Sequence, residues 1–279
     1  MNCLPLLCDT IPEDLQLKLR RELNETEENV SKGLHSLREF LKREEIPSRT
    51  DDDFLLCFLR AQKFNAKRSE EKLKRYCRMR QTLHDFFEDI DVAKMEAVLD
   101  SQIVGFLPYR DKKGRAVLFS RGYAWNKEAY DLVDSTKCAV LLVLYSLTFP
   151  LTTMTGICVI TDAKVEAIQD YYHNFRAFGT HTSTIMSLPC RFQRMDLFNE
   201  NFMCHYFYAA IRPLLSTKFS KRIFMHGEKI EQLKDWYDPS ILPTEFGGTM
   251  GPLSNESYRR TFLDFVREVK SECAYFSIR

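Results

Sequence analysis

The sequence is poor in residues that interrupt regular structure, and its cysteines are not paired in motifs. Only ten Gly and ten Pro occur in 279 residues, which disfavours collagen-like and glycine-rich repeat proteins. The nine Cys are an odd number without CxxC spacing, so a complete disulfide framework and a zinc knuckle are both disfavoured. With 40 Lys+Arg against 39 Asp+Glu, neither charge predominates, which removes a global electrostatic argument for nucleic-acid binding.

Long hydrophobic runs are missing as well. The longest approach, from Ala139 to Tyr145, is far shorter than the roughly 18–20 apolar residues that span a bilayer. The opening MNCLPLLCDTIPED lacks the basic lead-in and the small-residue cleavage site of a signal peptide. We therefore expect a reduced, intracellular, soluble protein.

Familiar catalytic and cofactor motifs are also absent. The sequence contains no GxGxxG, GxxxxGK[ST], HExxH or GxSxG, and its six His are dispersed. Cys273 and Arg279 have the spacing of a cysteine phosphatase, but no glycine lies between them to form a phosphate loop. Asp162 ends an apolar run without an identifiable partner base or nucleophile. We predict no enzyme activity, no catalytic residue, no metal site and no cofactor.

Hydrophobic spacing divides the chain into two regions, which we place at residues 1–88 and 89–279. Leucines at helical intervals fill residues 13–45, and Thr50-Asp51-Asp52-Asp53 offers an N-cap for a further helix. The cations that follow this N-cap are most simply interpreted as a solvated helix face, and they are Lys63, Lys67, Arg68, Lys72, Lys74, Arg75 and Arg78. The first region is therefore predicted to be a helical domain.

The second region alternates short apolar runs with helical stretches. The runs have the length of buried strands and comprise residues 116–119, 156–160, 195–198 and 223–225. This alternation favours an α/β domain with a mainly parallel sheet that is covered by helices on at least one face. A helical tail ends the chain.

One predicted helix, between Asn201 and Leu215, has an unusually broad apolar stripe. It is followed by Lys218, Lys221 and Arg222, whose spacing places three cations on one face if the helix continues. This arrangement suits either a core helix or a lipid-facing gate.

Four segments together resemble the CRAL-TRIO lipid-binding family, within it most of all the branch of tocopherol and retinaldehyde carriers. They are DDFLLCFLRAQKFNAKRSEEKL (Asp52–Leu73), GICVITD (Gly156–Asp162), PLLSTKFSKRIFMHG (Pro213–Gly227) and ILPTEFGG (Ile241–Gly248). The last resembles the family's closing motif and is the most specific. The order and spacing of the segments extend the resemblance over roughly residues 50–250.

The resemblance implies a carrier that encloses one small hydrophobic lipid, such as a tocopherol or retinoid-like isoprenoid, under a mobile lid helix. The pocket positions that it implies are Thr136, Val143, Thr180, Ser183, Thr184, Leu188, Phe192 and Met195, and those of the lid are Phe202, Phe207 and Ile211. Several of these are Thr or Ser where the tocopherol carrier is aliphatic. Such hydroxyls suit a more polar ligand, or they bond their own helix backbone.

The resemblance also implies docking on phosphoinositide headgroups of endosomal or other intracellular membranes by a monomeric, cytoplasmic protein. The implied docking residues are Arg191, Arg194, Lys218, Lys221 and Arg222. Arg194 is included because Gln193 occupies a position that is basic in the tocopherol carrier. Each such cation near an anionic surface adds about 1 kcal/mol to membrane binding.

Two alternatives remain open from the sequence. A phosphatidylinositol or phospholipid exchange protein would need polar and cationic groups inside the cavity. An interaction module with a vestigial pocket would recruit partners through its helical N-terminal region and bind no lipid.

Overall fold

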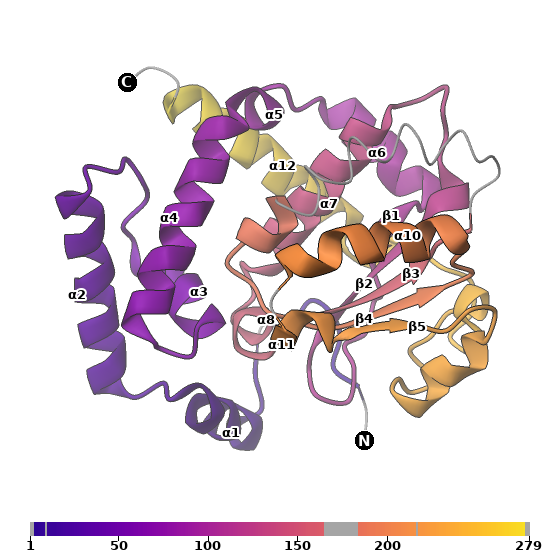
Figure 1. The fold of residues 1–279 in the computed structure, drawn as a ribbon, viewed down its shortest axis with the longest axis horizontal. Coiled ribbons are helices and arrows are strands. Elements are labelled where there is room, and N and C mark those ends of the chain that lie inside the picture. Colours follow the sequence, from indigo (N-terminus) through magenta and orange to yellow (C-terminus); the bar gives the residue numbers. More distant parts are fainter. Residues whose placement is uncertain (1–2, 9, 165–183, 216, 277–279) are drawn as a thin grey trace.

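The computed structural model describes residues 3–8, 10–164, 184–215 and 217–276. Six helices precede the first strand, namely α1 (Glu13–Leu23), α2 (Glu27–Arg43), α3 (Asp52–Ala61), α4 (Ala66–Thr82), α5 (His84–Glu88) and α6 (Val92–Ser101). The predicted N-cap is confirmed, because the Asp51 carboxylate accepts a hydrogen bond of 3.0 Å from the Phe54 amide. In Figure 1, α2, α3 and α4 stand to one side of the sheet.

A five-stranded sheet forms the centre of the rest of the molecule. Its strands are β1 (Val104–Phe106), β2 (Ala116–Arg121), β3 (Ile157–Asp162), β4 (Phe192–Phe198) and β5 (Ile223–Met225). They lie in the order β1-β2-β3-β4-β5, with β1 antiparallel and the remaining strands parallel. The four apolar runs of the sequence coincide with β2 to β5, which confirms the predicted α/β class with a mainly parallel sheet.

Helices and short 3₁₀ turns surround this sheet. The helices after β2 are α7 (Leu132–Ser146), α8 (Pro150–Thr155), α10 (Phe202–Ile211), α11 (Thr217–Ser220) and α12 (Glu256–Phe276). The 3₁₀ turns are η1 (Gly122–Ala124), η2 (Arg212–Leu214), η3 (Ile230–Asp235) and η4 (Thr244–Phe246). Figure 1 shows α10 crossing in front of the strands and α12 running behind α7.

Alternation along the strands gives the sheet two apolar faces. On one face Leu118 and Val159 belong to the core that includes α6, α7 and α12. On the other, Val117 and Ile160 pack in a smaller core with Phe246 of the closing segment. Buried side chains thus cover both faces, as a parallel sheet requires.

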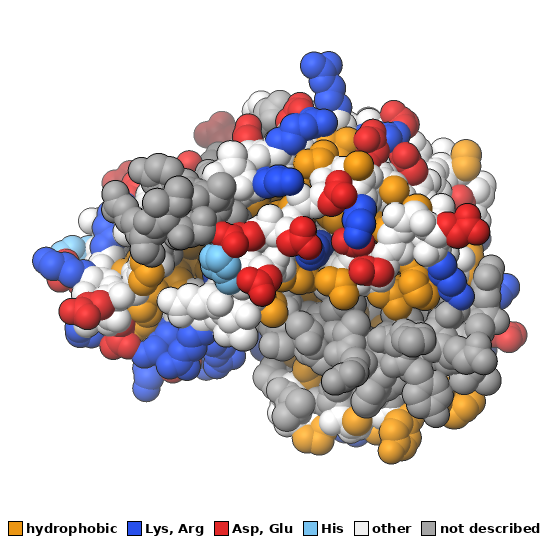
Figure 2. Space-filling model, turned by 90° about the horizontal axis from the view of Figure 1, so that it is seen from above, with side chains coloured by type: hydrophobic (Ala, Val, Ile, Leu, Met, Phe, Trp, Pro, Cys, Tyr) orange, Lys and Arg blue, Asp and Glu red, His pale blue; other side chains and the backbone are white. Residues whose placement is uncertain are grey.

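Side chains of opposite charge are interspersed on the face that contains α5 and α6. Figure 2, which views the molecule from above, shows acidic and basic groups next to one another over the centre of this surface and a group of Lys and Arg side chains at its lower left. Acidic and basic side chains therefore both occur on this face.

Candidate functional site

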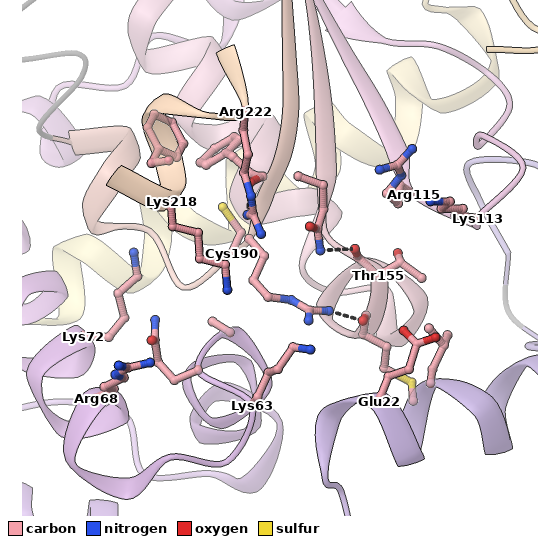
Figure 3. Close-up of a pocket in the computed structure, with 18 of the residues that line it drawn as sticks. Glu22, Lys63, Arg68, Lys72, Lys113, Arg115, Thr155, Cys190, Lys218 and Arg222 are labelled. Carbon is pink, nitrogen blue, oxygen red and sulfur yellow. Dashed lines mark hydrogen bonds between the residues drawn. The ribbon is translucent and has the colours of Figure 1, made fainter. Parts of the chain in front are cut away.

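A pocket of about 500 Å³ lies where the N-terminal helices meet the sheet and α11. Figure 3 shows basic side chains from several elements converging on it. The cations that line it are Lys63, Arg68, Lys72, Lys113, Arg115, Arg191, Lys218 and Arg222. Among the described lining residues only Glu22 is acidic. The site therefore suits a ligand with several negative charges.

One wall is built by the turn between α3 and α4. Lys63 and Phe64 both adopt left-handed backbone conformations, with φ of 52° and 57°, and this makes the turn tight. The Asn65 side chain caps α4 by accepting a 3.0 Å hydrogen bond from the Arg68 amide. Arg68 and Lys72 are then one helical turn apart on α4, so both reach the pocket.

The facing wall is built by the segment that leads into β4 and by the chain around α11. Arg191 donates through a terminal guanidinium nitrogen to the Met154 carbonyl of α8, and Gln193 donates to the Thr155 carbonyl at 3.0 Å. Arg222 donates to the Phe192 carbonyl. Lys218 extends from α11 toward the middle of the pocket in Figure 3. Backbone carbonyls thus hold Arg191 and Arg222 in place. Because a carbonyl carries no net charge, these hydrogen bonds do not neutralise the two guanidinium groups.

Burial and mutual repulsion lower the pKa of several basic side chains in this site. Burial lowers the pKa of Arg191 to about 10, with Arg222 adding to the effect, and burial also lowers the pKa of Lys72 and Arg222. The pKa of Lys218 is lowered chiefly by the neighbouring Arg222 charge, then by burial and by Lys63. A bound anion would relieve this repulsion, because an opposite charge favours the protonated forms.

Arg191 also has an unused donor. Within the described part of the chain its Nε is buried and has no hydrogen-bond partner. Because a buried donor without a partner is costly, an acceptor in the pocket would stabilise the protein as well as bind to it. Arg191 therefore forms part of the pocket wall and has one buried donor that no described residue satisfies.

Three of the five docking residues expected from sequence line this pocket, namely Arg191, Lys218 and Arg222. Arg194 does not line this pocket. Its side chain is 4% exposed and pairs with Asp196 at 2.7 Å, between the rings of Phe224 and Trp236. Strand alternation accounts for this position of Arg194, because its side chain points to the opposite face of β4 from Met195, which packs on the α7 side of the sheet.

Lys221 is also outside the group of lining residues. α11 ends at Ser220, so the helix does not continue as far as the expected three-cation face requires. Lys221 is exposed and Arg222 begins the approach to β5. Lys218 and Arg222 reach the pocket from a short helix and the turn after it.

Four of the eight expected pocket positions for a lipid lie in or against the core on the α7 side of the sheet. Val143, Leu188 and Phe192 are buried there, and Met195 packs against them. Thr136 and Thr184 are buried as well, and the Thr136 hydroxyl donates to the Leu132 carbonyl of its own helix at 2.8 Å. Thr180 and Ser183 lie outside the described residues.

The helix expected as a lid is present as α10, and Phe202 is the one of its three expected lid positions whose side chain is described. Phe202 is 70% exposed and Tyr206 is 69% exposed, so these two rings face solvent one turn apart. The structure therefore does not place Phe202 against the interior. The side chains of Phe207 and Ile211 lie outside the description.

Sequence reasoning missed five cations of the site. The sequence predicts a solvated face for Lys63, Arg68 and Lys72 and does not distinguish Lys113 and Arg115 from other cations, but all five line the pocket. The spacing of Arg68 and Lys72 was a signal, but the wall that they face is formed more than 100 residues later in the chain. Arg115 pairs with the buried Asp111, so it is partly neutralised.

The described residues offer neither a metal site nor a membrane span. They contain no cluster of three or more His, Cys, Asp or Glu that could hold a metal ion. No helix among them is long and apolar enough to cross a membrane.

Comparison with known proteins places both parts of the chain. The CRAL/TRIO domain family matches residues 99–248, and the family "Pinta-like, UBA domain" matches residues 26–97. The chain is 30% identical to human clavesin-2 over 94% of its own length and 81% of the relative's. It is 29% identical to mouse alpha-tocopherol transfer protein-like over 93% and 78% of the two lengths.

A solved structure shows the same fold. The crystal structure of Sfh5 superposes with a TM-score of 0.57, covering 88% of this chain and 91% of that chain at 14% sequence identity. At this identity the likeness concerns the arrangement of helices and sheet alone.

Proposed function

The chain belongs to the CRAL/TRIO domain family, and we propose that it carries a small hydrophobic lipid between membranes, docking through phosphoinositide headgroups. The cargo that we propose is a tocopherol or retinoid-like isoprenoid. Similarity to an alpha-tocopherol transfer protein-like relative supports this class. The buried positions on the α7 side of the sheet are its proposed surroundings, with hydroxyls of Thr136 and Thr184 among the apolar groups.

The observation that carries the docking proposal is the cationic pocket. In the described part of the chain, eight cations and one carboxylate line a space of about 500 Å³, which matches a headgroup with more than one phosphate. The buried Nε of Arg191 offers such a phosphate a hydrogen bond that no described residue supplies. The exposed rings of Phe202 and Tyr206 on α10 would enter the membrane interface beside the bound headgroup.

Charge reversal at Lys218 tests the docking. Lys218→Glu replaces a cation that lines the pocket with an anion, which is a change of two charge units. At about 1 kcal/mol per charge, binding to vesicles with a phosphatidylinositol bisphosphate should weaken about thirtyfold. Co-sedimentation with vesicles measures the change. Lys218 is exposed, so folding should be unaffected.

Lys221→Glu is the matched control. It makes the same change three residues away, on an exposed side chain that does not line the pocket. It should weaken binding far less than Lys218→Glu. Equal losses in the two variants would show that only diffuse surface charge matters and would refute the proposed docking site.

The cargo is tested by extracting lipid from protein purified from its own cells and identifying it by mass spectrometry. One isoprenoid at near-stoichiometric yield is the expected result. Recovery of phospholipid would instead favour an exchange protein. Recovery of no lipid would contradict the carrier and favour an interaction module.

A further inference from the structure

Among the described residues, the one acidic group that lines the cationic pocket comes from a helix that precedes both matched families. α1 ends before the family matches at residues 26–97 and 99–248 begin. Glu22, in its last turn, lines the pocket on the side away from Arg68 and Lys218, as Figure 3 shows. The site thus combines family walls with one carboxylate contributed from outside them.

Within α1, Lys18 lies one turn before Glu22, but the described residues form no ion pair between the two. A carboxylate in the last turn of a helix is disfavoured by the helix dipole, and Arg20 and Arg21 supply the favourable charges there. With the described residues Glu22 forms no hydrogen bond or ion pair, although its charge acts on Arg191. Its interactions are therefore directed at the pocket rather than at its own helix.

The chain holds Glu22 in place through the residues on either side of it. Leu19 and Leu23 are buried against Leu151 and Met154 of α8. Directly after α1, the Glu25 carboxylate binds the Arg60 guanidinium of α3 at 2.7 Å. These contacts fix the backbone on either side of Glu22, to α8 before it and to α3 after it. The Glu22 carboxylate is therefore held at the rim of the pocket.

We propose that Glu22 is a specificity-determining residue that limits how many phosphates the pocket accepts, by repelling phosphate on the α1 side. This inference rests on the proposed docking of phosphoinositides. The phosphates of a preferred headgroup would lie between Lys63 and Arg68 on one wall and Lys218 and Arg222 on the other. A further phosphate directed at α1 would meet the like charge of the Glu22 carboxylate.

The test is Glu22→Gln, which removes the charge and keeps the size of an exposed side chain. Vesicles of phosphatidylcholine with equal amounts of a mono-, bis- or trisphosphorylated phosphatidylinositol provide the ligand series. We expect the variant to bind trisphosphate vesicles about fivefold more tightly, the effect of one charge at an anionic surface. Monophosphate vesicles should change less than twofold, so selectivity should shift toward the most phosphorylated lipid.

Glu39→Gln is the control, because Glu39 is an exposed carboxylate on α2 that does not line the pocket. An equal gain in this variant, or a gain of Glu22→Gln on every headgroup alike, would assign the effect to general charge and overturn the proposal. Unchanged selectivity in Glu22→Gln, with Lys218→Glu still losing binding, would reject the role of Glu22 and leave docking intact. If the unmodified protein binds none of these vesicles, the docking proposal itself fails.

Soluble inositol bis- and trisphosphates separate the pocket from the membrane. Calorimetric titration should show the same change of preference in Glu22→Gln, because the repulsion acts inside the pocket. A change seen with vesicles and not with the soluble phosphates would place the effect at the membrane surface and overturn the proposal.

Discussion

Gly248 of the closing motif occupies a position that no other residue can fill. A Cβ placed there would lie 1.9 Å from the Leu242 carbonyl oxygen, which is backbone and therefore not free to move aside. The Gly248 amide also donates to the Pro243 carbonyl at 3.0 Å, so the segment folds back on itself. This close approach gives a physical reason for the glycine in ILPTEFGG.

The corresponding prediction is that Gly248→Ala lowers the free energy of unfolding by at least about 2 kcal/mol, because backbone must shift to admit the methyl group. Gly227→Ala is the control. Its φ of 59° is unfavourable for alanine, but nothing lies within 4 Å of the added Cβ, so the cost should stay near 1 kcal/mol. Denaturant unfolding of both variants measures the difference, and equal losses would contradict the steric explanation.

At the scale of the helix, α10 differs from an ordinary amphipathic helix in what it exposes. Phe202 and Tyr206 face solvent, whereas Met203, Cys204 and Tyr208 are half-buried. Exposed rings one turn apart form an apolar surface that bulk water disfavours and a membrane interface favours. One face of α10 therefore packs against the protein, and the other exposes aromatic rings that suit a membrane interface.

Replacing Phe202 and Tyr206 together with Ser should weaken vesicle binding at least about tenfold, since each ring would bury apolar area in the interface. The free energy of unfolding should change by less than about 0.5 kcal/mol, because both side chains are exposed. Val133→Ser, at an exposed apolar position on α7, should leave binding unchanged. Full binding by the double variant would locate the membrane contact elsewhere.

At the scale of the whole molecule, a network joins the N-terminal helices to the segment beside the sheet. Arg60 of α3 binds Glu25 and also donates to the Thr153 hydroxyl of α8 at 2.9 Å. The Glu25 side chain is 5% exposed and that of Arg60 is 14% exposed. The two walls of the pocket are therefore tied together by a nearly buried ion pair.

Glu25→Ala should cost about 3 kcal/mol of unfolding free energy, because it leaves the Arg60 charge buried without its carboxylate. Glu28→Ala removes a carboxylate whose pairing with Lys32 is almost fully solvated, and it should cost less than about 0.5 kcal/mol. Thermal or denaturant unfolding compares the two. Similar small losses would show that the Arg60 network does not hold the helices to the sheet.

Local chemistry made some features predictable. The Asp51 cap and the strands β2 to β5 follow from residues that are neighbours in the chain. The motifs that carry the resemblance to a family are likewise short stretches of sequence. β1 was not predicted, because Gly105 interrupts its short apolar run, whereas the equally short β5 is apolar throughout. The division of the chain at residue 88 stays a prediction.

The sequence by itself therefore determined the class of the fold, the family and three of the pocket's cations, because caps, strand runs and motifs depend on residues close together in the chain. Only the tertiary structure decided that Lys63, Arg68 and Lys72 face Arg191, Lys218 and Arg222, and that Arg194 does not. The reason is physical. A cation on a helix is solvated or confined according to what packs opposite it, and strand alternation assigns neighbouring side chains to opposite faces.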